Sequence, residues 1–509
     1  MSNEIPPQGR RDFLKKGTLA AVAFSAGASV SQGQEPAPEA TGPGVPKKPL
    51  PPTVEHKHSH VEAEYDGFSR YQPSRGHDPD SDYYLGKLVP GFRKPADGPA
   101  LITTPDLEKL PFKMVDGVKE FHVSAEEVSR EFLPGYHMNV YGYNGSLPGP
   151  LIEINQGDRI RILVTNNLSE ATNFHMHGFE MPVQYDGAAE MTQNPIQPGR
   201  TFKYEFDVHE EGTFFYHSHV AMQEAMGMVG PIVVHPAKPF DPPVDRDFIL
   251  VFQNFFILPN QTVSDSWSMD WNWHTINGRS GPYTTPCVVK HGERVRVRLI
   301  NFSPMQHHPI HMHGHTFWVT AHEGARAPKT AWIPRNTELV AVAQASEFEF
   351  IANNPGDWQF HCHMIHHMMN HMTRQNGPRI RQNVSVDQYM ENLDVRPTVT
   401  VTKTGRGTAP PGYPQKMQGM EMSMEFMKKV WQPREMKGMR EAAPMSMKGL
   451  MTSMRVLPDD LFHRVMETDE KIEKGAIFAE IVNRFGNPAD YKKTPPGMME
   501  KMMMHEGHS

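Results

Sequence analysis

The chain has 509 residues, long enough for two or three domains that each bury a core. Its formal net charge of −7 is small for this length, which argues against nucleic acid or an anionic membrane surface as a partner. Only two cysteines occur, Cys287 and Cys362, whereas methionine (34) and histidine (28) are abundant. Thioethers and imidazoles are good ligands for soft and borderline metal ions, so this excess indicates a metal-handling protein.

Residues 1–31 predict an export signal. Arg10 and Arg11 precede a short apolar run, 18–30, with small residues at 26–28 where cleavage is expected. The run is too short to cross a bilayer, so we expect an exported periplasmic or extracellular protein with no membrane span. Residues 32–110 are a Pro- and Gly-rich lead-in without periodicity, and the histidines at 56, 58 and 60 indicate a solvated tract with loose metal affinity.

Two β-sandwich domains are predicted between residues 111 and 400. Short alternating runs bounded by Gly, Pro and Asn are typical of antiparallel sandwiches. We place the first domain at 111–240 and the second at 245–400, with a Pro- and Asp-rich linker over 236–246. The clearest expected strands are 119–123, 159–164, 201–206, 248–252, 294–300 and 348–351. The sequence thus predicts an all-β protein, and Cys287 is expected to be an inert core residue.

Residues 401–509 form a methionine- and histidine-rich extension that we expect to be partly helical. The stretch 458–485 has the spacing of amphipathic helices, with apolar positions at Leu461, Val465, Ile472, Phe478, Ile481 and Val482. Two interpretations of the methionines stand side by side. Thioethers favour Cu(I), which makes the extension a collector of cuprous ions. Methionines also make adaptable apolar contacts, which makes it an arm that packs on a neighbouring subunit.

One short segment carries the densest set of ligand residues. Side chains alternate along a strand, so His361 and His363 point to one face and Cys362 to the other. A thiolate, two imidazoles and a weak thioether define a blue-copper site. Cys362 supplies the thiolate, His367 one imidazole and Met372 the thioether, and His308 is left to supply the second imidazole. His366, adjacent to His367, is a rival for that position, although the spacing favours His367.

Three further His-x-His pairs accompany the segment at 361–363. They are His175/His177, His217/His219 and His311/His313, and each places two imidazoles on one face of an extended strand. One such pair alone is weak evidence, because paired surface histidines often bind metal adventitiously. A lone cysteine is usually a small buried hydrophobe. Four such pairs in this order favour specific metal binding over adventitious surface binding and over a merely buried cysteine. A copper-storage protein is also compatible with them.

These residues resemble the four copper motifs of the multicopper oxidases, the laccase-like family. The segment 143–150, followed by Gly157-Asp158, is similar to the opening of a cupredoxin domain of that family. Two motifs precede the linker and two follow it, with no middle domain, which resembles a two-domain laccase with the blue copper in the second domain. The resemblance covers roughly 112–400 and implies two cupredoxin-like Greek-key sandwiches.

The resemblance also implies the cofactors and their ligands. Four copper ions per chain are expected, with the type 1 copper on His308, Cys362, His367 and Met372. The type 2 copper would take His175 and His311. The type 3 pair would take His177, His217, His219, His313, His361 and His363. Such an enzyme oxidises phenols, aromatic amines or metal ions one electron at a time and reduces dioxygen to water. In these relatives three chains form a ring, a homotrimer with the copper clusters between subunits.

Asp186 matches an acidic residue that the family places near the cluster as a proton donor. An aspartate before glycine is also a common turn residue. A further family acid has Met368 at its position here, so that part of the proton path is missing. Trp271, Trp273 and Trp332 are expected to be packing residues. A cuprous-ion oxidase in copper tolerance and a non-enzymatic copper store remain the alternatives. A copper nitrite reductase is excluded because it keeps its cysteine in the first domain.

Overall fold

The structure is a computed structural model that describes residues 100, 102–220, 222–257, 262–368 and 423–486, all within one compact unit. The predicted signal 1–31, nearly all of the lead-in, Met372 and both ends of the methionine-rich extension lie outside these residues. Among the described helices, none is long and apolar enough to cross a membrane.

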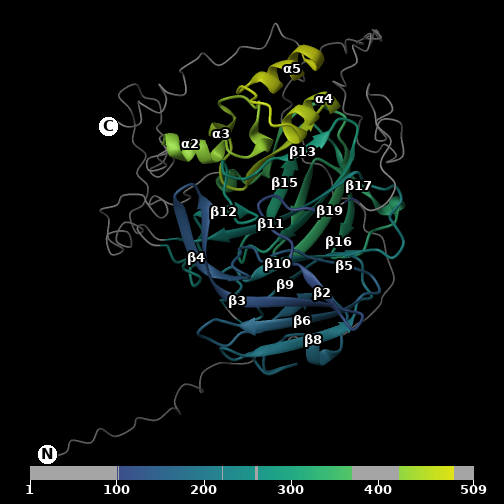
Figure 1. Ribbon diagram of the computed structural model, residues 1–509, viewed down its shortest axis with the longest axis vertical. Helices are drawn as coiled ribbons and strands as arrows, with labels where there is room; N and C mark the ends of the chain where they lie inside the picture. Colours follow the sequence, from purple (N-terminus) through teal and green to yellow (C-terminus); the bar gives the residue numbers. More distant parts are fainter. Residues whose placement is uncertain (1–99, 101, 221, 258–261, 369–422, 487–509) are drawn as a thin grey trace, which may run out of the picture. The chain divides into compact units, whose positions relative to one another are not determined.

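The first sandwich consists of two sheets (Figure 1). One contains, in order, β2 (Phe112–Val115), β3 (Val118–Leu133), β6 (Arg159–Asn166) and β8 (Thr201–Asp207), with β4 (Tyr136–Tyr143) paired to β3. The other contains β5 (Ile152–Asn155), β10 (Val229–His235), β9 (Gly212–His217) and β7 (His175–His177). Alternate residues such as Phe121, Ile162 and Tyr216 are fully buried between the sheets, because successive strand side chains point to opposite faces.

The second sandwich also has two sheets. The larger contains β1 (Ile102–Thr103), β11 (Arg246–Phe255), β14 (Arg294–Asn301), β19 (Gln344–Ile351), β16 (Phe317–His322) and β17 (Ile333–Arg335), with β12 (Trp273–Ile276) paired to β11. The other contains β13 (Cys287–Lys290), β21 (Met451–Leu457), β20 (Gly356–Cys362), β15 (His308–Met312) and β18 (Thr337–Val340). The all-β prediction is confirmed, and Cys287 lies in the core, where burial raises the pKa of its thiol.

The sheets are mixed and not purely antiparallel as expected. The pairs β3–β6, β5–β10, β11–β14 and β13–β21 are parallel. Parallel neighbours need a crossover connection, so each of these pairs joins strands that are not connected by a simple hairpin. Local alternation in the sequence predicts a strand but does not specify the direction of its neighbour.

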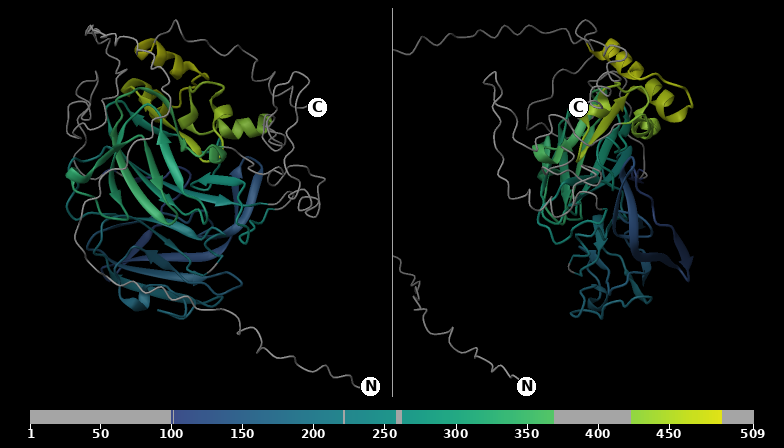
Figure 2. Two further views of the ribbon diagram at one scale, coloured as in Figure 1. Left: turned by 180° about the vertical axis from the view of Figure 1, so that it is seen from behind. Right: turned by 90° about the vertical axis from the view of Figure 1, so that its left-hand side faces the viewer.

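The extension contributes a strand to the second sandwich. β21 runs antiparallel to β20, the strand that ends in Cys362, and parallel to β13. The expected end of the sandwich near residue 400 therefore differs from the structure. Around β21 lie α2 (Met424–Val430), α3 (Ala443–Ser446), α4 (Asp459–Phe462) and α5 (Ala476–Phe485), with short helical turns η4 (Arg434–Met436) and η5 (His463–Glu467). Figure 2 shows these yellow segments against the edge of the sandwich that carries β13.

Most of the described methionines of the extension are packing residues, whereas Met424 is exposed. Met427, Met436, Met439, Met447 and Met451 are buried in one cluster with side chains of the β3–β4 hairpin. The described part of the helical arm therefore packs on its own chain, where one of the two interpretations had placed it on a neighbouring subunit. Leu461, Val465 and Ile481 are buried as predicted, and Ile472 packs at the edge of the same cluster. Phe478 and Val482 are half-buried.

The two sandwiches share an apolar interface and a buried ion network. Phe215 and Val233 of the first pack with Ile249 and Ile300 of the second. Beside them Arg298 bridges Asp247 and Glu347, and the Thr213 hydroxyl of the first sandwich donates to Glu347 at 2.6 Å. Burial raises the pKa of the neighbouring Glu349. Three guanidinium groups, those of Arg326, Arg296 and Arg294, outweigh that effect and hold the pKa well below its usual value.

Candidate metal centres

The strand β20 divides its side chains between two faces. In its pairing with β15, Ile310 lies opposite Cys362 and His311 lies opposite His361. Directly opposed residues in a sheet point to the same face. Cys362 therefore faces the core with Ile310, and His361 faces the other side with His311. His308, two residues before Ile310, lies on the Cys362 face, as the alternation predicts.

His308, Cys362 and His367 converge on one buried point. The Cys362 Sγ atom lies 3.6 Å from Nδ1 of His308 and 3.4 Å from Nδ1 of His367. The two Nδ1 atoms are 3.1 Å apart. His367 is buried in η3 (Ile365–Met368), whereas its rival His366 is exposed. The structure thus brings His367 to the cysteine and leaves His366 at the surface.

The outer nitrogens of both imidazoles are also held. His308 Nε2 lies 2.7 Å from Ser303 Oγ, and His367 Nε2 donates to Gln306 Oε1 at 3.1 Å. Such partners orient a ligand ring and leave Nδ1 for the metal. Burial lowers the pKa of His367 to about 4 and that of His308 well below its usual value. Burial also raises the pKa of Cys362 to about 12, so metal binding must displace its proton.

Two neighbours of this centre were not predicted as site residues. The His274 ring lies against that of His367 with centroids 4.3 Å apart and the planes tilted by 32°, and both of its nitrogens are buried without a hydrogen-bond partner. Trp271 stands edge-on to His367 at 6.1 Å, a contact beyond the simple packing role expected of it. No motif in the sequence marks His274 as part of the centre. It lies on β12, and this strand comes close to His367 only in the folded chain. Trp273 and Trp332 are buried, as expected.

A first histidine quartet lies on β7, β9 and the turn after β9. His175 pairs with His217 in the strand register, and the ring centroids are 5.2 Å apart. His177 and His219 complete the quartet, with rings 5.6 and 6.0 Å from that of His217. Met176 between the pair points into the core. Burial lowers the pKa of His177 to about 4, which keeps the imidazole neutral and able to bind metal.

Backbone carbonyls fix the ring orientation in this quartet. His175 Nδ1 donates to the Asp186 carbonyl at 2.5 Å, and His217 Nδ1 donates to the Ser218 carbonyl at 2.8 Å. Each bond leaves Nε2 as the free ligand atom. His217 Nε2 is buried and has no hydrogen-bond partner. An unpartnered buried nitrogen among three other imidazoles is what a metal-binding position requires.

A second quartet is built on β15 and β20. It consists of His311, His313, His361 and His363, with ring centroids 4.9 to 5.6 Å apart. His313 Nε2 and His361 Nε2 approach to 3.0 Å. His311 Nδ1 donates to the Asn336 carbonyl at 2.6 Å, and His361 Nδ1 to the Cys362 carbonyl at 2.8 Å. These bonds direct the Nε2 atoms of His311 and His361 away from the backbone, and that of His361 meets His313 Nε2.

The two quartets are separate in this chain. Ring contacts join histidines within each quartet, but none of the described residues provides a contact from one quartet to the other. Both quartets reach the surface, at His219 in the first and His363 in the second. Among the described residues the eight histidines thus form two groups, and the resemblance had implied clusters that lie between subunits.

Two carboxylates lie beside the first quartet. Asp186 Oδ1 is 3.6 Å from His175 Nδ1, in the turn after η1 (Val183–Tyr185), so the expected proximity is present. Gly187 shapes that turn, since its φ is +87° and a Cβ there would overlap the Phe174 carbonyl. Glu224, not singled out in the sequence, has Oε1 3.5 Å from His217 Nδ1. Both carboxyl groups are partly exposed, at 39% and 41%.

The donor set fits copper. A buried thiol with two converging Nδ1 atoms matches the thiolate and imidazole ligands of a blue-copper site. Imidazoles with free Nε2 atoms suit copper or zinc, and the absence of cysteine from the quartets favours neither a zinc thiolate site nor an iron–sulfur cluster there. His361 and His363 flank Cys362 in the chain, so the backbone connects the thiol covalently to the second quartet.

Comparison with known proteins agrees with this donor set. Two family models, each described as multicopper oxidase, match residues 124–239 and 258–377. A copper resistance protein A homolog of Pseudomonas syringae pv. tomato is 26% identical, over 42% of this chain and 44% of its own. Laccase-1 of Botryotinia fuckeliana is 30% identical, over 46% of this chain and 41% of its own. The solved structure of the multicopper oxidase mgLAC is 30% identical, with a TM-score of 0.46 over 51% of this chain and 82% of that one.

The chain belongs to the multicopper oxidase family, because one family model falls on each of its two β-sandwiches. It spans less than half the length of the first curated relatives that it matches. Both family models lie within the two sandwiches and end before the described part of the extension. The description of both family models as multicopper oxidase agrees with the copper-type donor set of the described residues.

Proposed function

We propose that this protein is a laccase-like oxidase that removes single electrons from a reducing substrate and delivers four of them to dioxygen. Four substrate molecules each lose one electron, and four protons join dioxygen to give two waters. The observation that carries the proposal is the convergence of Cys362 with His308 and His367, on a strand whose neighbouring histidines belong to a quartet.

The proposed ligands follow the two faces of β20. The type 1 copper would be held by His308, Cys362 and His367, with Met372, outside the described residues, as a further ligand. The type 2 copper takes one histidine from each quartet, His175 and His311. The type 3 pair takes the other six, His177, His217, His219, His313, His361 and His363. Copper in these positions supplies the one-electron redox chemistry and the oxygen-reducing centre.

The chain's own groups orient the ligands and handle protons. Asp186 Oδ1, 3.6 Å from His175 Nδ1 and partly exposed, is placed to exchange protons between solvent and the first quartet. The burial of His308 and Cys362 excludes water from the thiol. The backbone between Cys362 and its flanking histidines is the shortest covalent connection from the buried thiol to the second quartet.

We propose assembly from several chains. Two observations support it: each quartet reaches the surface, and no ring contact joins the two quartets among the described residues. We propose a homotrimer, in which the first quartet of each subunit meets the second quartet of the next. We also propose export, on the basis of Arg10 and Arg11 in the predicted signal 1–31.

The decisive test is a copper count with a visible absorption spectrum on the purified, copper-loaded protein, together with oxygen uptake. We expect four coppers per chain and an intense blue band that disappears in Cys362→Ser, which retains the quartets. Oxygen uptake with an arylamine or Cu(I) must disappear in the same variant. Many more coppers, no blue band and no effect of Cys362→Ser would replace the proposal with a copper store.

A further inference from the structure

Asn173, two residues before His175, is a fully buried side chain at the point where three segments of the first quartet meet. Its Oδ1 atom accepts a hydrogen bond from His219 N at 2.7 Å, and its Nδ2 atom donates to the Gly187 carbonyl at 2.5 Å. Beside Gly187, the Asp186 carbonyl holds the His175 ring. One amide therefore ties the segment of the first His-x-His motif to the second motif and to the turn that carries Asp186.

The strand pairing does not place these two partners of Asn173. The β7–β9 ladder ends at His217, so His219 lies beyond it. The turn at Gly187 is also outside the ladder, although a Cβ on this glycine would overlap the Phe174 carbonyl. Both segments need contacts other than the ladder, and Asn173 gives each of them a hydrogen bond from the core.

Two further buried side chains extend this bonding to the loop after β9. The Ser218 hydroxyl lies 3.3 Å from Asn173 Oδ1 and 2.7 Å from Gln223 Oε1. Gln223 Nε2 in turn donates to the Ala171 carbonyl at 2.9 Å. Ser218 and Gln223 are both buried, and a bonded polar network inside a core favours one arrangement of the segments that it joins. Side chains thus bind the loop to the segment before His175.

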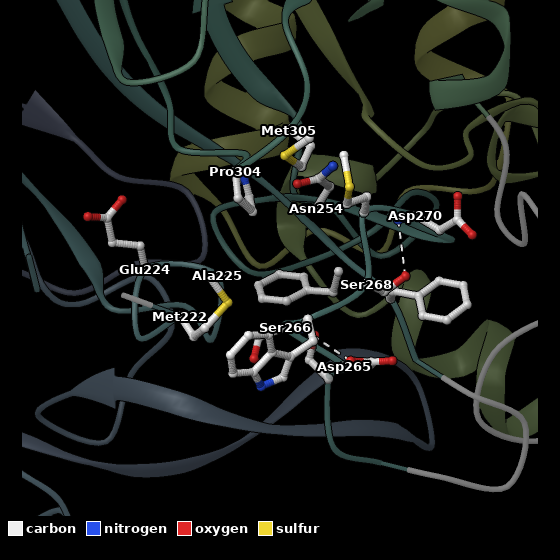
Figure 3. A pocket seen from close by; sticks show the side chains of 15 residues that line it. Met222, Glu224, Ala225, Asn254, Asp265, Ser266, Ser268, Asp270, Pro304 and Met305 are labelled. Carbon is white, nitrogen blue, oxygen red and sulfur yellow. Dashed lines mark hydrogen bonds between the residues drawn. The ribbon is translucent and has the colours of Figure 1, made fainter. Parts of the chain in front are cut away.

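The opposite side of this loop faces solvent. Met222 and Glu224, on either side of Gln223, line a cavity of about 330 Å³ (Figure 3). Met222 is exposed and Glu224 is partly exposed. Asn173 is not among the residues that line this cavity. A change at Asn173 therefore acts on the quartet from the buried side of the loop.

His219 is the exposed member of the first quartet. Its ring centroid lies 5.7 Å from that of His175 and 6.0 Å from that of His217. An exposed residue outside a ladder has backbone and rotamer freedom that metal binding must remove. Ligands of a working metal site have to be held within about 0.5 Å of the productive geometry. The bond from His219 N to a buried acceptor removes part of that freedom before any metal binds.

We propose that Asn173 is a positioning residue for the first quartet, which sets His219 relative to His175 before copper binds. Its second bond holds the Asp186 turn, and with it the carbonyl that orients the His175 ring. This inference rests on the proposed function, in which both histidines hold copper. The hydrogen bonds of Asn173 go to backbone groups and to a serine, not to a ligand ring, so it acts through the backbone of the two segments.

The first test is amide hydrogen exchange on the copper-free, full-length chain at about pH 8, where a carboxyl group is ionised. Asn173→Leu removes both backbone hydrogen bonds at similar size. We expect the peptide with the His219 amide and the peptide of the turn 186–188 to exchange about tenfold faster, the effect of one lost hydrogen bond. Asn173→Asp keeps an acceptor for His219 N but places an oxygen against the Gly187 carbonyl. It should accelerate only the turn peptide, and it gives a separate test if leucine prevents folding.

The second test is a copper titration that follows the two kinds of centre separately. The blue band reports the mononuclear centre, and the remaining bound copper reports the quartets. In Asn173→Leu the affinity of the quartets for copper should fall about tenfold to a hundredfold, as expected when groups that orient the ligands are lost. The blue band should keep its intensity, because Cys362 lies on the second sandwich.

The matched control is Asn166→Leu. Asn166 is also fully buried in the first sandwich, and its side chain also makes three hydrogen bonds, to Leu168 N and to the carbonyls of Glu170 and Ile196. None of these partners belongs to the quartet. The control should lower the urea midpoint of unfolding as much as Asn173→Leu does, and it should leave the His219 exchange rate and the copper affinity unchanged.

Unchanged exchange at His219 in Asn173→Leu, or an equal loss of copper affinity in Asn166→Leu, would overturn the inference. A wild-type protein that consumes no oxygen with any reductant would instead overturn the proposed function. The exchange measurement does not depend on that activity, so the two failures are distinguishable.

Discussion

Mixing two inactive variants tests whether each eight-histidine cluster is shared between chains. His175→Ala/His219→Ala removes two ligands from the first quartet, and His311→Ala/His363→Ala removes two from the second. All four side chains are at least partly exposed, so their truncation leaves the cores intact. Each variant alone assembles only clusters with one damaged half. In a ring, a cluster is intact where an undamaged first quartet meets an undamaged second quartet of the next chain.

The expected magnitude follows from this geometry. With equal amounts of both variants assembling at random, about one quarter of the clusters are intact, whatever the number of subunits in the ring. Coexpressed variants should therefore regain about a quarter of the wild-type oxygen uptake per chain, measured with one reductant at saturation. Variants that are purified separately and mixed after assembly should stay inactive. The pair His122→Ala/His209→Ala, which removes exposed histidines outside the quartets, should retain full activity. Coexpressed activity no greater than that of the separate variants would refute the shared cluster.

Three further predictions concern stability. Glu349→Gln should lower the free energy of unfolding by about 3–5 kcal/mol in urea melts, because it leaves buried arginines uncompensated; a change under 1 kcal/mol would contradict the network's role. Burial lowers the pKa of His291 and His315 to about 4. Below pH 6.5 these histidines are therefore protonated in the unfolded chain while they stay neutral in the folded chain, so stability falls with pH. Copper-free protein should lose about 2 kcal/mol per histidine between pH 7 and 5, and His291→Leu should flatten that slope. Met454→Ala, at a fully buried position of β21, should cost about 2–5 kcal/mol; a neutral result would mean that β21 is dispensable to the core.

The three residues that converge at the candidate mononuclear centre were largely predictable from local spacing. Strand alternation placed Cys362 and His361 on opposite faces, and the register of β20 with β15 has that arrangement. His367 and His308 then followed by spacing and by elimination. The residues that surround these side chains could not be predicted from the sequence. Gln306 and His274 have no distinguishing pattern in the sequence, because they reach the centre through a turn and a strand pairing with distant residues.

The extension shows the same limit at the level of the fold. Its methionine count suggested metal binding, and its amphipathic stretch correctly predicted apolar positions such as Leu461 and Val465. The period of a segment indicates which of its faces is apolar but not what covers that face. β21 finds its neighbours more than 80 residues away, between β13 and β20, and the methionines around it fill a core shared with the β3–β4 hairpin.

The sequence by itself determined the all-β class, the two sandwiches and the residue types and spacing of the metal ligands, because these depend on alternation within single strands and on ligand chemistry. Only the tertiary structure decided that β21 lies beside the cysteine strand and that His274 and Gln306 adjoin the buried centre. Those features arise where segments distant in sequence meet, and their positions follow from packing and strand register across the whole chain.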